Sequence, residues 1–284
     1  MMKKMIAMML AILMILSLTA CGSSGDSGAE EKDRLAKIKE AGKITLVTEP
    51  YFAPMEFIDP NKTGDDQFQG VDIEIAKYIA DKLGVELEIV ALDFTPLLVA
   101  MADGKYDMAI SAIAYSPSRA EAMNLSDVYM IAGGGYGFIC RSEDVNKYTS
   151  IASLEGATVI TQSGSVQEYL YNDQIKDAVK VKEFKLVDNM TTAYLAVSEG
   201  KADVCVCSTE SAQLYAEANG GLAVPDFLLD VDPNMNGTVV ALGPDDTDSL
   251  KEFINQCIAE LKATDQITKW NDEYKAYAAS LGIE

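Results

Sequence analysis

From residue 43 onward, short apolar runs alternate with stretches in which apolar side chains recur every three or four residues. The short runs predict buried strands, and the longer spacing predicts helices with one apolar face. The clearest helix covers residues 71–83, where Gly84 supplies a left-handed stop. Regular alternation of strands and helices is typical of a mostly parallel α/β sheet.

The alternation occurs twice along the chain. Three consecutive glycines, Gly133 to Gly135, separate the two series, and they permit backbone conformations that other residues avoid. This segment is therefore a candidate hinge. The first series has strands at 44–47, 85–92 and 107–113, with helices at 71–83 and from Thr95 to Gly104. The second has strands at 136–140, 158–161, 179–184 and 202–207, with helices at 166–171, 190–199 and 211–218.

The C-terminal part fits neither series. Residues 238–242 predict a strand, and residues 247–263 and 267–278 predict two amphipathic helices. These elements form either a small third domain or a return of the chain to the first series.

The N-terminus carries a targeting pattern. A basic start at Lys3-Lys4 precedes an apolar run over 5–16, which is short for a membrane span, and then Leu18-Thr19-Ala20-Cys21. This order predicts a signal peptide over 1–20 and resembles a bacterial lipobox, in which Cys21 is lipidated; an ordinary signal peptide is the alternative. Residues 21–42 are polar and glycine-rich at first and predict a flexible linker. We expect an extracytoplasmic protein, lipid-anchored to the outer face of the cytoplasmic membrane.

Composition narrows the chemistry. The 284 residues carry a formal charge of −21, which disfavours nucleic acid as a partner. The chain has no histidine, so histidine-based catalysis and histidine metal ligation are excluded. Cys205 and Cys207 lie in an apolar strand and predict a buried structural pair; a redox or zinc role is the alternative. We expect mostly free thiols, no metal and no cofactor.

Several short motifs occur in one order and spacing. They are Glu49-Pro50-Tyr51-Phe52-Ala53-Pro54-Met55-Glu56-Phe57, Gly70-Val71-Asp72-Ile73-Glu74-Ile75, Asp107-Met108-Ala109-Ile110-Ser111, Ser118-Arg119 and Leu125-Ser126-Asp127. Together they resemble the polar amino-acid-binding proteins of ABC importers, the family 3 extracellular solute-binding proteins, over residues 43 to about 280. Val71 departs from the family pattern, which has an aromatic or larger aliphatic residue there.

The resemblance implies an α/β, two-lobed periplasmic-binding-protein-like fold of type II. Two crossing hinge strands join the lobes in this family, and the C-terminal helices pack on lobe 1. Residues 43–131 and 238–284 would form lobe 1, and residues 132–237 would form lobe 2, with a second crossing near 232–237. The ligand would close between the lobes.

The resemblance also implies the ligand-binding residues. Arg119 stands where the family's arginine grips the ligand carboxylate, a task suited to a planar guanidinium; from its local sequence alone it would be a solvated helix residue. Phe52 and Phe94 stand where relatives place aromatics on either side of the ligand side chain, and Tyr115 is a third candidate. Glu49 matches an acidic position that meets the distal cation in relatives that bind lysine or arginine. The remaining implied positions are Ala112, Ala114, Ser165, Val166, Gln167, Ser208 and Glu210.

Some of these positions depart from the family pattern. Ala112 and Ala114 replace frequent serines, which leaves backbone N–H groups at Ala114 and in the turn 163–166 to bind the carboxylate. Ser208 replaces an aspartate that binds the ligand ammonium in many relatives. Three explanations stay open: Glu210 or Glu49 binds the ammonium, aromatics and carbonyls hold it, or the ligand is not a standard α-amino acid.

These observations predict a monomeric solute-binding lipoprotein that captures an amino acid and delivers it to an ABC permease in the membrane, not an enzyme. One alternative is a binding protein for a non-standard zwitterion or a carboxylate. Others are a sensor that acts through a partner, and an enzyme similar to cyclohexadienyl dehydratase with Glu210 as general acid.

Overall fold

A computed structural model describes residues 33–131 and 133–283, within a compact unit that begins at Asp33. The predicted signal peptide and the lipidation site Cys21 lie outside the described residues. Within the described part of the chain, no helix has the length and apolar character needed to cross a membrane.

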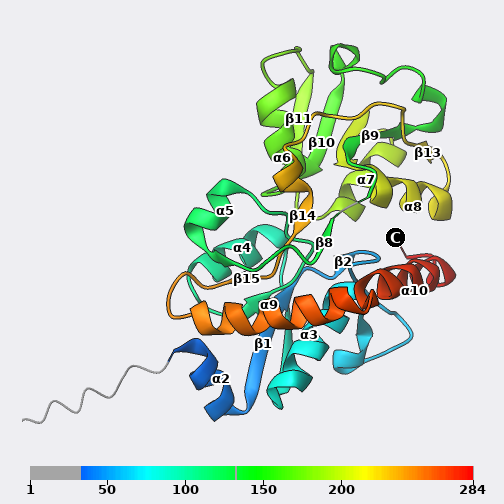
Figure 1. Cartoon of the computed structure of the whole chain (residues 1–284). Helices are drawn as coiled ribbons and strands as arrows, with labels where there is room; N and C mark the ends of the chain where they lie inside the picture. Colours follow the sequence, from blue (N-terminus) through cyan, green and yellow to red (C-terminus); the bar gives the residue numbers. More distant parts are fainter. Residues whose placement is uncertain (1–32, 132, 284) are drawn as a thin grey trace, which may run out of the picture. The chain divides into compact units, whose positions relative to one another are not determined.

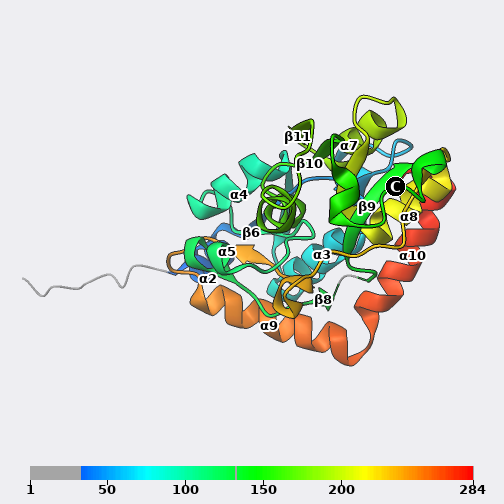
Figure 2. The same cartoon turned by 90° about the horizontal axis from the view of Figure 1, so that it is seen from above.

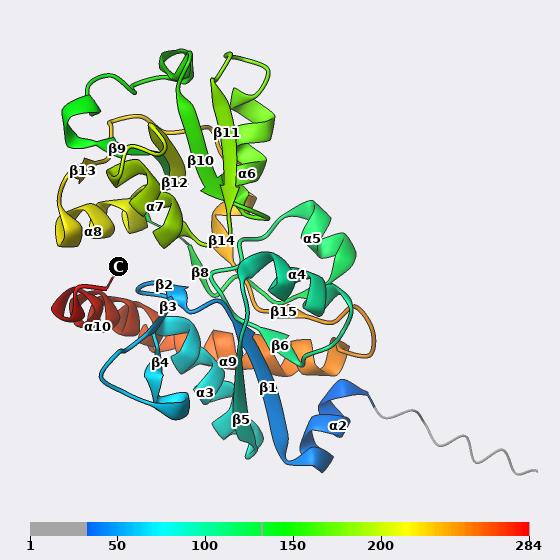
Figure 3. The same cartoon turned by 180° about the vertical axis from the view of Figure 1, so that it is seen from behind.

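Lobe 1 is built on a five-stranded sheet in the order β5-β1-β6-β15-β7. Strands β1 and β15 of this sheet are labelled in Figure 1, and β5 and β6 are labelled as well in Figure 3. Strand β1 pairs in parallel with both β5 and β6, whereas β15 runs antiparallel to β6 and β7. The strands are β5 (Glu86–Ala91), β1 (Lys43–Thr48), β6 (Met108–Ala109), β15 (Ala241–Leu242) and β7 (Asn124–Leu125). A small antiparallel sheet beside it contains β2 (Tyr51–Phe52), β3 (Glu56–Ile58) and β4 (Phe68–Gln69).

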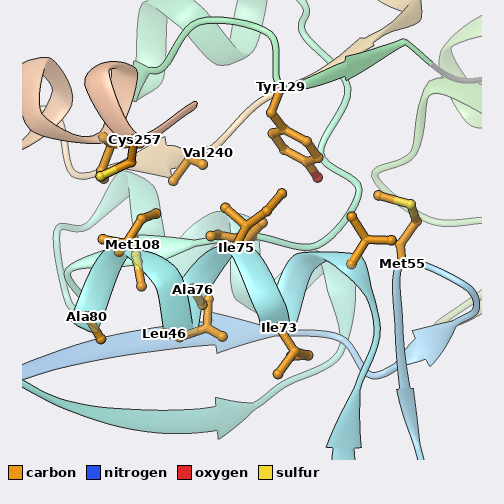
Figure 4. Packing of buried hydrophobic residues seen from close by; sticks show 14 of the residues in the cluster. Leu46, Met55, Ile73, Ile75, Ala76, Ala80, Met108, Tyr129, Val240 and Cys257 are labelled. Atoms are coloured by element: carbon orange, nitrogen blue, oxygen red, sulfur yellow. The ribbon is translucent and has the colours of Figure 1, made fainter. Parts of the chain in front are cut away.

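Helix α3 (Val71–Leu83) lies at the centre of the lobe 1 core, with an apolar face that is fully buried. Figure 4 shows its Ile75 and Ala76 between the sheet residue Leu46 and residues from later in the chain, including Tyr129 and Val240. The other lobe 1 helices are α2 (Arg34–Ala41), α4 (Phe94–Ala102), α5 (Pro117–Ala122), α9 (Asp248–Ala263) and α10 (Gln266–Leu281).

Lobe 2 repeats the plan with a sheet in the order β11-β10-β12-β9-β13. Strand β10 is parallel to β11 and β12, and β9 runs antiparallel to β12. The strands are β9 (Tyr136–Arg141), β10 (Thr158–Gln162), β11 (Glu183–Val187), β12 (Val204–Ser208) and β13 (Leu222–Ala223). The helices are α6 (Val166–Leu170), α7 (Met190–Ser198) and α8 (Thr209–Asn219). Short turns of 3-10 or π-helix occupy Gly64–Gln67, Ser142–Asp144, Ile151–Leu154, Tyr171–Ile175 and Pro233–Asn236.

The chain passes between the lobes at a two-stranded antiparallel ribbon. Strand β8 (Met130–Ile131) carries it out of lobe 1 and β14 (Gly237–Thr238) carries it back. In the sequence, one residue separates β8 from the three glycines, so the candidate hinge lies next to this ribbon.

One local motif occurs in both lobes. Asp107 in lobe 1 accepts a hydrogen bond from the Thr45 N–H at 2.7 Å, and Asp203 in lobe 2 accepts one from the Thr158 N–H at 2.8 Å. Each aspartate ends a Gly-Lys-x-Asp stretch that follows a helix and leads into a strand. The motif ties that strand to its parallel neighbour, so both sheets are fixed near the same end in the same way.

The C-terminal helices α9 and α10 both contact α3, and α9 also contacts α2 (Figure 2). The described chain therefore returns to lobe 1 and forms no third domain. The predicted strand 238–242 is divided: Thr238 pairs in the crossing ribbon, whereas Ala241 joins the lobe 1 sheet.

Two expectations about individual elements are corrected. The linker was expected to extend to residue 42, but Arg34–Ala41 forms helix α2, whose Arg34 is paired with Asp107 at 3.2 Å. The strand predicted at 179–184 begins at Glu183, where it pairs with Thr158. Val179 and Val181 pack against the lobe 2 core from a loop, which produces the apolar pattern without a strand.

Candidate functional site

A cavity lies where the two lobes meet, close to the carboxyl ends of β1, β10 and β12. Open α/β sheets commonly bind ligands at this end of their parallel strands. All eleven ligand-binding residues expected from the sequence line it: Glu49, Phe52, Phe94, Ala112, Ala114, Arg119, Ser165, Val166, Gln167, Ser208 and Glu210. The lining also includes residues that the sequence did not predict to bind the ligand, namely Pro54, Met55, Glu56, Ser111, Met130, Tyr136, Gln162, Ser211, Thr238 and Asn271.

Arg119, on the short helix α5, is a buried cation with 9 % of its surface exposed. Its guanidinium donates to the Ala114 carbonyl at 2.5 Å and to the Gly164 carbonyl of lobe 2 at 2.8 Å. Burial lowers the pKa of Arg119 to about 10, although the side chain stays charged at neutral pH. Among the described residues no carboxylate lies within ion-pair distance of it. A buried guanidinium with spare donors is suited to bind a ligand carboxylate.

One aromatic ring lies against this cation, and further aromatic residues line the cavity. The guanidinium carbon of Arg119 lies 5.5 Å from the centroid of the Phe94 ring, within cation–π range. Phe94 also belongs to the lobe 1 core, so it is both a core residue and a wall of the cavity. Phe52 packs against the cores of both lobes. Tyr115 packs against the lobe 1 core and is not among the lining residues, whereas Tyr136 of β9 is.

Glu49 supplies an unpaired acid at the end of β1. Its side chain is 2 % exposed, and its Oε1 atom is buried without a hydrogen-bond partner. Burial raises the pKa of the Glu49 carboxyl to about 8, opposed in part by the side chain of Gln162. A buried carboxyl group of this kind strongly favours a positively charged ligand group when it ionises.

Two further buried carboxyl groups, Glu56 and Asp72, lie close to each other, and Glu56 also lines the cavity. The Ser111 hydroxyl accepts from the Glu49 N–H and donates to Glu56, both at 3.0 Å. Asp72 accepts from the Ala112 N–H at 2.7 Å and from the Tyr129 hydroxyl at 2.8 Å. Burial and mutual repulsion raise the pKa of Glu56 well above its usual range, and burial also raises that of Asp72. Two such close carboxyl groups share a proton, and Asp72, which has two donors, carries the negative charge.

The backbone at Ala112 is strained. Its φ of 44° lies in the left-handed region, which side chains other than glycine rarely adopt. The hydrogen bond from its N–H to Asp72 holds this conformation. Strain of this kind persists where the surrounding structure determines it, commonly at ligand sites.

Two of the backbone donors expected in the turn 163–166 are already used. The Gly164 N–H donates to the Glu168 carboxylate at 2.6 Å, and the Ser163 N–H donates to the Val187 carbonyl. Ser165 caps α6, because its hydroxyl accepts from the Glu168 N–H at 3.1 Å. Ser165 therefore serves the helix as well as lining the cavity.

Glu210 is not a free acceptor. One of its carboxylate oxygens accepts from the Gly133 N–H at 3.0 Å, and the other is paired with Lys275 of α10. This ion pair joins lobe 2 to the C-terminal helix of lobe 1, and Asn271 of the same helix lines the cavity. Ser208 lies at the end of β12, where it is 7 % exposed. Ser208 is an uncharged polar residue of the lining, whereas Glu210 is paired with Lys275.

Metal-binding groups and reactive cysteines are the other candidate chemistry in the described part of the chain. No group of three or more acids or cysteines there is arranged to hold a metal ion. Cys140, Cys205, Cys207 and Cys257 are buried free thiols, as expected. Burial raises the pKa of Cys205 well above its usual value, which keeps this thiol protonated and unreactive.

Residues 44–276 match the profile of the bacterial extracellular solute-binding proteins, family 3. The chain belongs to this family. The family 3 match confirms the resemblance seen in the motifs, and the solved structures of similar proteins confirm the two-lobed type II fold.

Among the relatives of this family 3 protein, one is named for arginine and another was solved with arginine bound. The arginine-binding extracellular protein ArtP of Bacillus subtilis is 27 % identical over 273 residues, which cover 94 % of this chain and 96 % of ArtP. The solved structure of an amino-acid ABC transporter substrate-binding protein from Streptococcus pneumoniae, bound to L-arginine, is 31 % identical with a TM-score of 0.78. That match covers 86 % of this chain and 98 % of the other.

An enzyme is also similar. The cyclohexadienyl dehydratase of Pseudomonas aeruginosa is 24 % identical over 186 residues, which cover 66 % of each chain. It shares the family's fold, so the fold alone does not separate transport from catalysis.

Proposed function

We propose that this protein captures an α-amino acid with a cationic side chain and delivers it to an ABC permease. The observation that carries the proposal is the pair of unmatched groups in one cavity. Among the residues that the structure describes, Arg119 is a buried cation without a carboxylate partner, and Glu49 is a buried acid without a cationic partner. A ligand with a carboxylate at one end and a cation at the other would satisfy both.

The ligand carboxylate would bind Arg119 together with free backbone N–H groups of Ala114, Ser165 and Val166. The side chain would extend past Phe52 and Phe94, whose flat faces suit a planar cation or an apolar stem. Its cationic end would meet Glu49 Oε1. The names of the arginine-binding relatives support this choice of ligand class.

The α-ammonium group would be held by neutral acceptors. Glu210 already has two partners, so Ser208 and backbone carbonyls are the better candidates. Ala112 contributes its backbone to the same wall. Gln167, from the first turn of α6, would complete the lobe 2 side of the site.

Transport would use the two-lobed arrangement. A ligand that touches both lobes stabilises their closed arrangement, and a permease that recognises closure would then receive it. Arg119 already donates to the Gly164 carbonyl of lobe 2, so the proposed carboxylate anchor also contributes to closure. We propose that the protein acts as a monomer, anchored through a lipid on Cys21.

Thermal unfolding tests the ligand class. The protein lacking residues 1–20 and carrying Cys21→Ser is refolded to remove carried-over ligand and then heated with each of the twenty amino acids, betaines, polyamines and small carboxylates. A ligand that binds only the folded state raises the midpoint according to its concentration relative to Kd. We expect a shift of several degrees with arginine or lysine; a shift only with a quaternary amine or a carboxylate would refute the proposal.

Two further assays address anchoring and catalysis. We expect radiolabelled palmitate to label the full chain and to be absent after Cys21→Ser; labelling that persists would refute lipidation at Cys21. We expect no turnover of prephenate or arogenate, since the one acid that lobe 2 contributes to the described lining is neutralised by Lys275. Turnover that is lost in Glu210→Gln would favour the enzyme.

A further inference from the structure

Glu49 has no positive partner in the wall it occupies. Its Oε1 atom is buried, lines the cavity and accepts no hydrogen bond. Arg119 is the one basic residue among the described lining residues, and it is held by the Ala114 and Gly164 carbonyls.

The groups facing Glu49 are neutral or acidic. Gln162 reaches it from β10, and Asp93, which precedes α4, adds negative charge nearby. Glu56 lies on the other side of the Ser111 hydroxyl and also repels a charge on Glu49. Glu56 in turn lies next to Asp72, which accepts from the Tyr129 hydroxyl, and no described cation is paired with either carboxyl group. These surroundings favour a protonated Glu49 when no ligand is bound.

A protonated carboxyl group and a carboxylate offer different contacts. The protonated form presents one O–H donor and one acceptor, as an amide does, whereas the ionised form only accepts. The two forms therefore suit different ligands in the same cavity.

We propose that Glu49 selects the ligand by its own protonation: a cationic side chain binds with Glu49 ionised, and a neutral hydrogen-bonding side chain binds with Glu49 protonated. This inference rests on the proposed function, because it requires the ligand side chain to reach Glu49. In the cationic case the Glu49 O–H bond breaks and its proton leaves to solvent, while the guanidinium of the ligand keeps all of its protons. In the neutral case no proton is released.

The size of the effect follows from linkage. With a pKa of about 8 in the empty cavity, Glu49 is about nine-tenths protonated at pH 7, so arginine should release about 0.9 proton on binding. The preference for arginine over a neutral analogue should rise about tenfold per pH unit, because below pH 8 a higher pH strengthens arginine binding and above pH 8 it weakens binding of the neutral analogue.

Calorimetry tests this with L-arginine and L-citrulline, which have nearly the same shape but differ in charge. Each is titrated at pH 7 into the refolded protein in phosphate, HEPES and Tris, whose ionisation enthalpies differ. The slope of the observed enthalpy against the ionisation enthalpy gives the number of protons released. We expect a slope of about 0.9 proton for arginine and about zero for citrulline. Repeating both titrations at pH 6 and 8 gives the ratio of the two Kd values.

Two variants serve as matched controls. Glu49→Gln keeps the shape of the side chain but cannot ionise, so we expect no proton release and a Kd ratio that does not depend on pH. Glu88→Gln changes an exposed carboxylate on β5, paired with Lys43, and should leave both results as in the unaltered protein.

Different experimental results would overturn this inference and the proposed function. Tight binding of arginine with no proton release, or a Kd ratio that is constant from pH 6 to 8, would overturn the inference and leave the function intact. Absence of binding by every amino acid would overturn both.

Discussion

Replacement of Arg119 by alanine should separate ligand binding from folding. The substitution removes the guanidinium that we assign to the ligand carboxylate and leaves that carboxylate in a cavity without another cation. Removing one partner of a buried charge pair typically costs about 2–5 kcal/mol, which corresponds to a loss of affinity from roughly 30-fold to several thousand-fold.

The stability of the ligand-free protein should change much less. Burial lowers the pKa of Arg119 to about 10, which corresponds to roughly 3 kcal/mol of unfavourable burial that alanine avoids. Against this, Arg119→Ala loses two charged hydrogen bonds to carbonyls and the contact with Phe94. These contributions oppose each other and are of similar size, so we expect a change of no more than about 2 kcal/mol in the free energy of unfolding.

Arg141 provides the matched control. Its guanidinium lies in lobe 2, where it donates to the Val197 and Ala202 carbonyls and pairs with Asp144 and Asp203 at 3.1 and 3.2 Å. It is not among the residues that line the cavity. Arg141→Ala should therefore lower the urea midpoint of unfolding and leave the Kd for arginine within about twofold, the opposite of Arg119→Ala.

Titration calorimetry with L-arginine and agmatine measures the effect on binding. Agmatine lacks the carboxylate, so it should bind the unaltered protein weakly and should lose little further affinity in Arg119→Ala. Affinity for arginine within threefold of the unaltered protein would remove Arg119 from the carboxylate site. An equal loss for both ligands would mean that Arg119 shapes the cavity without binding the carboxylate.

Three other perturbations test separate features. The free energy of unfolding of the ligand-free protein should fall as the pH rises from about 4.5 to 8, because Glu49 keeps its proton in the folded state over that range and loses it in the unfolded chain. Urea unfolding at the two pH values should show a smaller fall in the free energy of unfolding for Glu49→Gln. Lys275→Met removes an ion pair between α10 and α8 whose side chains are 28 % and 32 % exposed. Because solvent and salt screen a partly exposed pair, calorimetry should show arginine binding weakened about fivefold or less at low salt and unchanged at high salt. Gly70→Ala places a Cβ 2.2 Å from the Met55 carbonyl oxygen and should lower the free energy of unfolding in urea by several kcal/mol. Gly84→Ala meets no neighbouring atom but has a φ of +71°, and it should cost about 1 kcal/mol. Equal losses in the two variants would contradict the steric argument.

The spacing of apolar residues predicted helices and strands well where the buried residues lie within a helix or a strand. The spacing of apolar residues placed α3 at the residues it occupies, with Gly84 at its C-terminal cap. The pattern failed at 179–184 because Val181 is half-buried from a loop, so an apolar residue there indicates packing and not a strand. Periodicity alone does not distinguish the two cases.

The cavity was predictable in part. The resemblance to the family pointed to Arg119, Glu49 and Phe94, and all three residues line the cavity. Asn271 and Lys275 were not identified, because they reach the site only after α10 packs back on lobe 1, about 140 residues beyond the hinge.

Charge pairing was the least predictable feature. Glu210 was a reasonable candidate for the ligand ammonium in the sequence, but in the structure Lys275 occupies one of its oxygens and the Gly133 N–H occupies the other. Glu56 stood within a quoted motif, yet nothing in the sequence showed that it meets Asp72 in the interior. Such pairs depend on tertiary contacts between residues that are distant in sequence.

A crystal structure of the protein with L-arginine tests the assignment most directly. We expect the ligand carboxylate within hydrogen-bond distance of the Arg119 guanidinium and the ligand guanidinium against Glu49 Oε1, between Phe52 and Phe94. A ligand bound in the reverse orientation, or a carboxylate held without Arg119, would contradict the assignment of these residues.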